Sequence, residues 1–102
     1  MNQAAQAVST ISGEIDAHMR RSGIPNSSWY VGITEDIDDR LFGYHRVPRQ
    51  NHWFIFRRCI DANAARILEA AYHRAGCKGG PGGGNFGCVF IYAYVITNST
   101  VE

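Results

Sequence analysis

Three short apolar runs constrain the fold of this chain more than any other feature, and the clearest is V-F-I-Y-A-Y-V-I at residues 89–96. Trp29–Ile33 and Trp53–Cys59 share its mixture of β-branched and aromatic residues, which is typical of strands. Three strands leave the faces of a sheet open to water, so helices must pack on them. The connections decide neither the strand order nor whether neighbouring strands run parallel or antiparallel.

Helical periodicity accounts for most of the remaining chain. Apolar residues recur at helical spacing across residues 3–21, and Gly23 ends that pattern. A second, acidic helix is expected after Thr34, which we predict to be its N-cap residue. A third helix is expected to begin after Asp61 and to end at Gly76. The predicted fold class is therefore α+β, a small three-stranded sheet flanked by about three helices.

The length and composition of the chain limit the classes of protein to consider. The 102 residues suit a single domain over residues 1–102. No apolar run approaches the roughly 18 residues of a membrane span, so we expect no membrane partner. The first residues lack the basic start and apolar block of a secretory leader, so a cytoplasmic location is expected. The odd number of cysteines favours free thiols, although Cys77 and Cys88 bracket a glycine loop and could approach each other.

The charge of the chain is nearly balanced but unevenly distributed. The formal net charge is +1, and nine of the ten basic residues are arginine. Arg46, Arg49, Arg57 and Arg58 fall within thirteen residues, beside aromatic side chains. A planar guanidinium matches phosphate oxygens, so these four arginines predict a nucleic-acid-binding patch. An ordinary solvated surface with local salt bridges is the alternative.

The segment G-C-K-G-G-P-G-G-G-N-F-G-C at residues 76–88 contains seven glycines. Backbone amides without neighbouring Cβ atoms can approach a phosphate closely. However, the segment lacks the Gly-Lys-Ser/Thr that opens a helix in a Walker-type loop, and a strand follows it. A phosphate cradle and a flexible connection therefore both stay open.

Two charged residues stand out on the predicted helices. Arg40 lies in an otherwise acidic helix, where Asp36 is one turn away and would form a surface ion pair with it. Glu69 has Arg66 and His73 at helical spacing, so local pairing would explain Glu69 in the same way. In either pairing the charged group would be occupied and unable to take part in chemistry.

The stretch Y-V-G-I-T-E-D-I-D-D-R-L-F-G-Y-H resembles the second signature and following helix of the GIY-YIG endonucleases. Residues 30–32 match the family's Tyr-Val/Ile-Gly element, and Arg40 matches the arginine eight residues after its glycine. Tyr44, with His45 beside it, matches the His/Tyr position one turn later. On the next long helix Glu69 resembles the family's metal-binding glutamate, and Asn85 resembles an asparagine found further on.

The resemblance implies a fold like that of the family, with an N-terminal helix, and a divalent-metal-dependent nuclease that cleaves phosphodiester bonds. It implies Mg²⁺ or Mn²⁺ as cofactor and nucleic acid as partner. The implied roles are metal ligand for Glu69, charge stabiliser for Arg40, base or water positioner for Tyr30, assistant to the base for Tyr44 or His45, and nucleic-acid contact for Asn85.

One element of the family is missing from this chain. The first signature, Gly-Ile-Tyr, lies on a strand before Tyr-Val-Gly, but residues 20–28 contain only G-I-P and no tyrosine. The tyrosine of that signature is the family's usual proton acceptor. Tyr92 or Tyr94 on the last strand could replace it if that strand lies beside Tyr30 in the sheet.

Two other classes of protein compete with the nuclease. The first is a non-catalytic GIY-YIG-like protein that binds a protein or a nucleic acid. The second is an unrelated α+β binding module, for example a homodimer. A single cleft beside Tyr30 that contains both Arg40 and Glu69 would favour the resemblance, whereas their placement on opposite surfaces would count against it.

Overall fold

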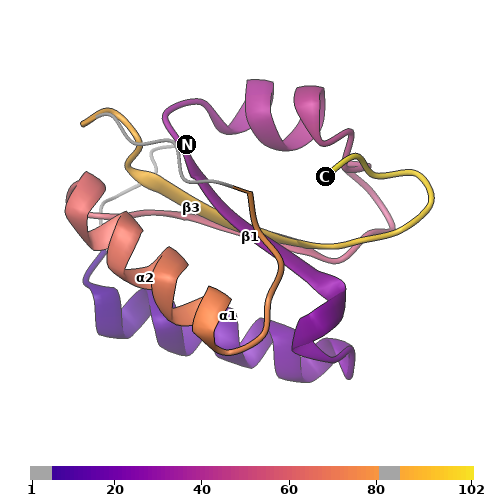
Figure 1. The fold of residues 1–102 in the computed structure, drawn as a ribbon, viewed down its shortest axis with the longest axis horizontal. Helices are drawn as coiled ribbons and strands as arrows, with labels where there is room; N and C mark the ends of the chain where they lie inside the picture. The colour runs from indigo at the N-terminus through magenta and orange to yellow at the C-terminus, as the bar shows by residue number, and fades with distance from the viewer. Residues whose placement is uncertain (1–5, 81–85) are drawn as a thin grey trace.

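A computed structural model describes residues 6–80 and 86–102 of the chain (Figure 1). In chain order the elements are α1 (Val8–Ser22), η1 (Asn26–Ser28), β1 (Trp29–Thr34), η2 (Asp38–Tyr44), β2 (Phe54–Arg58), α2 (Ala62–Arg74) and β3 (Phe90–Val95). The predicted α+β class with one three-stranded sheet is confirmed. No helix in this part of the chain is both long enough and apolar enough to cross a membrane.

The strands form one antiparallel sheet in the order β1-β3-β2, so the last strand of the chain is the central one. The register of β3 against β1 places Tyr94 opposite Tyr30 and Tyr92 opposite Gly32. On its other side, β3 pairs with β2, where Phe54 lies opposite Tyr94. The condition under which Tyr92 or Tyr94 could replace the missing tyrosine is therefore met.

Alternating side chains give the sheet two apolar faces. One face packs against α1 and α2, which lie together below the sheet in Figure 1, and it contributes Trp29 and Val31 to that core. The other face lies under η2 and packs Tyr92 against the fully buried Leu41. Because successive strand residues point to opposite faces, Tyr30 lies on the η2 side although both its neighbours lie on the α1/α2 side.

The ends of α1 and α2 follow the chemistry expected from the sequence. Gly23 caps α1 in the left-handed conformation with φ +69°, which glycine adopts without a Cβ clash. The Asp61 carboxylate accepts the Ala64 N–H at 2.8 Å at the start of α2. At its other end α2 stops earlier than predicted, because Ala75 and not Gly76 is the C-cap residue, and Gly76 follows in the left-handed region at φ +105°.

The acidic helix differs from the prediction, because Thr34 is not its N-cap. Thr34 ends β1, and its hydroxyl accepts the Asp36 N–H at 3.1 Å within a turn. The helix begins later, where Asp36 Oδ1 accepts the Asp39 N–H at 3.0 Å. The helix is also a π-helix, and the bond from His45 N–H to Arg40 O at 3.0 Å spans five residues. The competing carboxylate of Asp36 explains why the helix starts beyond the predicted cap.

The beginning of the glycine-rich segment lies along the outer edge of β1. Lys78 N–H donates to Trp29 O, and Lys78 O accepts the Val31 N–H, each at 2.8 Å. This part of the segment is therefore attached to the sheet and is not a free connection. Residues 81–85, with the predicted nucleic-acid contact Asn85, lie outside the described residues.

All three cysteines are free and buried, so the prediction of unpaired thiols is confirmed. Cys77 and Cys88, which bracket the glycine-rich segment, do not form a disulfide. Burial raises the pKa of Cys59 and that of Cys77 to about 11, so both are protonated at neutral pH.

Candidate functional site

Three tyrosines from β1 and β3 form a stacked cluster on the η2 side of the sheet. The Tyr30 ring lies 5.2 Å from the Tyr94 ring and 6.4 Å from the Tyr92 ring, centroid to centroid. Gly32 makes room for this arrangement, because a Cβ at Gly32 would lie 2.5 Å from the Tyr92 hydroxyl oxygen. The Y-V-G pattern thus has a physical reason in the sheet. Its tyrosine stacks on the tyrosines of β3, and its glycine leaves space for the Tyr92 hydroxyl.

His45 follows η2 and binds the hydroxyl of Tyr92. The imidazole is 1% exposed, and its Nε2 lies 2.8 Å from Tyr92 Oη while its Nδ1 lies 2.6 Å from Val101 O. A carbonyl oxygen can only accept, so Nδ1 carries the hydrogen and Nε2 accepts the hydroxyl hydrogen of Tyr92. Burial lowers the pKa of His45 below its ordinary value of 6.5, so the ring is neutral at pH 7. The pair is therefore arranged to pass a proton from the phenol to the imidazole.

The Tyr30 hydroxyl lies against the glycine-rich segment, where it accepts the Gly80 N–H at 3.0 Å. Burial raises the pKa of Tyr30, whereas the bond from Gly80 and the charge of Arg40 act in the opposite direction. Because the pKa rises on balance, Tyr30 stays protonated at neutral pH. This geometry favours Tyr30 as a hydrogen-bond donor and not as the base.

Arg40 borders a cavity beside Tyr30. The cavity has a volume of about 450 Å³ and is lined by Tyr30, Arg40, Tyr44, Gly79, Gly80 and Glu102. The guanidinium carbon of Arg40 lies 5.1 Å from the centroid of the Tyr44 ring, a cation–π contact. The expected ion pair with Asp36 does not form, because the two ion pairs within the described residues involve neither side chain. An exposed guanidinium with no carboxylate partner can receive an anion in this cavity.

Glu69 on α2 is half-buried, and it forms no ion pair with Arg66 or His73. Burial raises the pKa of Glu69, and the nearby charges of His73 and Arg66 only partly offset this effect. Within the described part of the chain, no hydrogen bond reaches its side chain either. The local pairing expected as an alternative is therefore absent, and the carboxylate oxygens are available to a cation.

Arg40 and Glu69 act electrostatically on the same phenols. After the larger effect of burial, the charge of Arg40 lowers the pKa of Tyr30 and of Tyr92, whereas the charge of Glu69 raises both. Glu69 does not line the Arg40 cavity, however. The two residues thus lie within electrostatic range of one tyrosine cluster, but only Arg40 is at the cavity wall. The cavity beside Tyr30 therefore does not meet the condition that would favour the resemblance, which was one cleft containing both residues.

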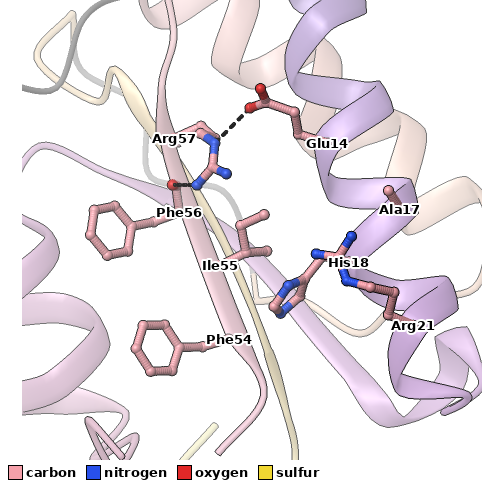
Figure 2. Close-up of a pocket in the computed structure, with 8 residues that line it drawn as sticks. All are labelled: Glu14, Ala17, His18, Arg21, Phe54, Ile55, Phe56 and Arg57. Atoms are coloured by element: carbon pink, nitrogen blue, oxygen red, sulfur yellow. Dashed lines mark hydrogen bonds and ion pairs between the residues drawn. The ribbon is translucent and has the colours of Figure 1, made fainter.

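The arginines expected to form one patch are divided between the two sides of the sheet. Arg57 points toward α1, where its Nε donates to the Glu14 carboxylate at 2.7 Å in a groove of about 410 Å³ (Figure 2). Figure 2 shows the reason, since Ile55 and Arg57 point toward α1 whereas Phe54 and Phe56 point away from it. Arg57 is therefore occupied and lies on the face opposite the tyrosine cluster.

The other three arginines of the predicted patch lie in different surroundings. Arg49 is on the η2 side, where it pairs with Asp38 at 3.2 Å and its guanidinium carbon lies 3.9 Å from the Phe42 ring centroid. Arg46 and Arg58 are exposed and form no ion pair within the described residues. Closeness in sequence therefore did not bring the four guanidinium groups together.

Several contacts of the site could not be predicted from the sequence. The carbonyl of Val101 sets the His45 tautomer, and the amide of Gly80 binds the Tyr30 hydroxyl, yet both come from segments far away in sequence. Main-chain groups leave no residue pattern. Only Tyr92 and Tyr94 were named in advance, as replacements for the missing tyrosine and on condition of the strand order, and the bond from Tyr92 to His45 was not predicted.

The described residues contain no group of three or more His, Cys, Asp or Glu side chains arranged to hold a metal ion.

Comparison of the chain with known families, with curated proteins and with solved structures found no match. Its function must therefore be inferred from the chemistry of the site.

Proposed function

We propose that this protein is a small divalent-metal-dependent nuclease, similar to the GIY-YIG endonucleases, which cleaves phosphodiester bonds. The observation that most supports the proposal is the pairing of β3 with β1. Through this pairing Tyr92, with His45 on its hydroxyl, lies beside the Y-V-G strand. A tyrosine from the end of the chain can then act in place of the one missing before Tyr30.

The proposed general base is the Tyr92–His45 pair. Tyr92 is buried and does not line the Arg40 cavity, so this role requires the attacking water to reach its oxygen from the Tyr30 side. The Tyr92 oxygen would then take a proton from the water while its own hydroxyl proton passes to His45 Nε2. The two transfers are coupled, because burial raises the pKa of Tyr92 and a free phenolate would be costly. The water oxygen forms a bond to phosphorus as the bond from phosphorus to the leaving oxygen breaks.

Arg40 and Tyr30 would act on the phosphate and the water. The Arg40 guanidinium stabilises the negative charge that develops on the phosphoryl oxygens, and within residues 6–80 and 86–102 no ion pair with a carboxylate holds it elsewhere. The Tyr30 hydroxyl, which accepts from Gly80, donates to a phosphate oxygen or to the water. Tyr44 supports Arg40 through its ring.

Glu69 is the proposed ligand for Mg²⁺ or Mn²⁺. Its half-buried carboxylate forms no ion pair within the described residues, and a single protein oxygen suits an ion that keeps several waters. When bound, the metal supplies Lewis-acid stabilisation of the scissile phosphate and the leaving oxygen.

Arg46, Arg58 and Asn85 are the proposed nucleic-acid contacts outside the centre. Arg49 and Arg57 would contribute only after leaving their carboxylate partners. The net charge of +1 supplies little non-specific affinity for nucleic acid, so we propose a small structured substrate, a second copy of the chain or a partner protein to provide targeting. The three free thiols suit a reducing compartment such as the cytoplasm.

A non-catalytic module that binds a protein or nucleic acid is the second candidate. It is favoured by Glu102, which lines the Arg40 cavity and places a carboxylate where the phosphate would bind. Such a module would keep the strand, turn and helix as scaffold and would bind without cutting.

The proposal is tested by cleavage of plasmid DNA and RNA with Mg²⁺ or Mn²⁺ and with EDTA. Arg40→Ala, Glu69→Gln and Tyr92→Phe should each lower the rate by about 10²-fold or more, because each removes a group that acts in the transition state. Glu35→Gln and Arg74→Ala remove an exposed carboxylate and an exposed guanidinium that form no ion pair within the described residues, and they should stay within about threefold of the wild-type rate.

Metal-dependent cutting that is lost in the three site variants and kept in the two controls would establish the nuclease. Equal activity in all six proteins would indicate a contaminant and exclude the catalytic centre. A wild-type chain that binds nucleic acid or protein without cutting would support the binding module instead.

A further inference from the structure

Lys78 forms a single parallel β-bridge with Tyr30 at the edge of β1, and this pairing does not continue along the chain. Lys78 N–H donates to Trp29 O, and Val31 N–H donates to Lys78 O, as in a parallel ladder. The next bond of such a ladder would run from Gly80 N–H to Val31 O. The Gly80 amide instead donates to the Tyr30 hydroxyl at 3.0 Å.

His73 occupies the position of the missing ladder bond. Its Nε2 lies 2.8 Å from Val31 O, and because the carbonyl only accepts, Nε2 is the donor. A Cβ added to Gly79 would collide with that same nitrogen, so the imidazole lies directly against the Gly79 backbone. The ring thus separates the glycine segment from β1 at the point where the ladder would otherwise continue.

The displaced Gly80 amide determines how the Tyr30 hydroxyl is used. Since the phenol oxygen accepts from Gly80, its hydrogen is left to donate, and no acceptor for it exists within residues 6–80 and 86–102. Tyr30, Gly79 and Gly80 all line the Arg40 cavity. A Cβ at Gly80 would lie 2.9 Å from the Tyr30 oxygen, so glycine allows this close approach.

We infer that His73 is a positioning residue: by capping Val31 O it redirects the Gly80 amide onto Tyr30, which sets the Tyr30 hydroxyl as a hydrogen-bond donor to the ligand of the Arg40 cavity. The importance of His73 for catalysis rests on the proposed nuclease function. The arrangement of hydrogen bonds does not depend on that function and can be tested separately.

The test of the arrangement is amide hydrogen exchange by NMR on the ¹⁵N-labelled full chain without metal. Tyr30→Phe removes the acceptor and should speed exchange of the Gly80 amide about fivefold to tenfold relative to wild type. His73→Leu frees Val31 O, so the Gly80 amide can complete the ladder, and adding Tyr30→Phe to His73→Leu should then change its exchange by less than about twofold. His73→Gln offers an amide donor of similar reach, so Tyr30→Phe should keep its full effect in that background. The Val31 amide, bound to Lys78 O, reports that the Lys78 bridge is intact.

A full effect of Tyr30→Phe, about fivefold to tenfold, in a folded His73→Leu chain would overturn the inference, because the Gly80 amide would then reach Tyr30 without His73. His73→Ala makes the same comparison if His73→Leu does not fold.

A kinetic test addresses the catalytic meaning. His73→Leu and Tyr30→Phe should lower kcat by similar factors with little change in KM, and the double variant should be no slower than Tyr30→Phe. Additive losses in the double variant would overturn the positioning role. A wild-type chain that cuts no substrate would refute the proposed function, whereas the exchange measurement would still decide the role of His73.

Discussion

At the scale of single residues, glycines determine how closely the side chains of the tyrosine cluster can approach their neighbours. Gly32 lies opposite Tyr92 in the register of β1 and β3, and the space that it leaves is filled by the Tyr92 hydroxyl. Tyr92 is 2% exposed and is bound to His45, so it has little freedom to move aside. The glycine of the Y-V-G pattern is therefore required by a residue sixty positions later in the chain.

Replacement of this glycine tests that requirement. We expect Gly32→Ala to lower the free energy of unfolding by about 1–3 kcal/mol, because the added methyl group overpacks a rigid site. The cluster should also lose the Tyr92–His45 bond, since the Tyr92 ring must shift. Urea unfolding measures the loss, with Gly13→Ala as control because a Cβ at Gly13 meets no atom within 4 Å. Equal stability of Gly32→Ala and wild type would show that the tyrosine adapts without cost.

At the scale of secondary-structure elements, local chemistry predicted the helices well only where one cap residue had no rival. Asp61 at α2 and Gly23 at α1 both act as expected. At η2 the hydroxyl of Thr34 and the carboxylate of Asp36 compete for nearby amides, and the helix starts after the second of them. Propensity cannot decide between Thr34 and Asp36 as the cap. The difference between their capping free energies is small compared with the free energy gained when Leu41 of the helix packs in the core.

The cap of α2 can be tested with a matched pair of substitutions. Asp61→Ala removes the acceptor for the Ala64 N–H and should cost about 0.5–2 kcal/mol of unfolding free energy. Asp61→Asn keeps an acceptor at the same position, so its loss of unfolding free energy should be only a few tenths of the Asp61→Ala loss. Thermal and urea unfolding of both variants gives the comparison. Equal losses would mean that the charge near the helix N-terminus matters more than the hydrogen bond.

At the scale of the whole molecule, the sheet order decides which charged and titratable groups meet. The arginines at 57 and 49 separate to opposite faces, whereas Tyr30, Tyr92 and His45 come together from three segments. Burial in the folded protein lowers the pKa of His18 and of His45, and this effect depends on packing between elements and not on a single element.

We expect the protein to lose stability as the pH falls below about 6.5. Burial lowers the pKa of both His18 and His45, so the unfolded chain takes up protons that the folded chain does not bind. Above the ordinary histidine pKa both states are neutral and this effect vanishes. Burial raises the pKa of Glu69 above its ordinary value of 4.5. At pH values above about 4.5 the folded chain therefore holds a proton on Glu69 more readily than the unfolded chain does, so acidification in this range stabilises the fold through this group.

Urea unfolding at pH 7.5 and at pH 5.5 measures this dependence. The free energy of unfolding should be lower at pH 5.5 for wild type, and the difference should shrink in the His18→Gln variant. The Glu69→Gln variant should show a larger fall, since the opposing carboxyl is removed. An unfolding free energy that rises on acidification would contradict the assignment of neutral, buried imidazoles.

Burial of all three thiols predicts slow chemical modification. In the folded chain, Cys59, Cys77 and Cys88 should react with Ellman's reagent at least about tenfold more slowly than in urea, because they are buried and burial raises the pKa of Cys59 and Cys77 to about 11. Absorbance at the released chromophore's wavelength follows the reaction. Rapid modification of one thiol in the native chain would identify a local opening near it.

The sequence by itself determined the fold class, the three strands and two of the helix ends, because periodicity and capping depend on residues near one another in the chain. It also pointed to Arg40 and Glu69, which are indeed unpaired within the described residues. Each of these features depends on side-chain types at fixed local spacing, so each can be seen in a sequence before any fold is known.

Only the tertiary structure decided that β3 is central and lies beside β1, and hence that Tyr92 and Tyr94 face Gly32 and Tyr30. It also decided that main-chain groups of Val101 and Gly80 orient His45 and Tyr30. The physical reason is that strand pairing and main-chain hydrogen bonds join segments far apart in the chain. Every residue carries the same amide and carbonyl, so no local pattern records which of them will meet.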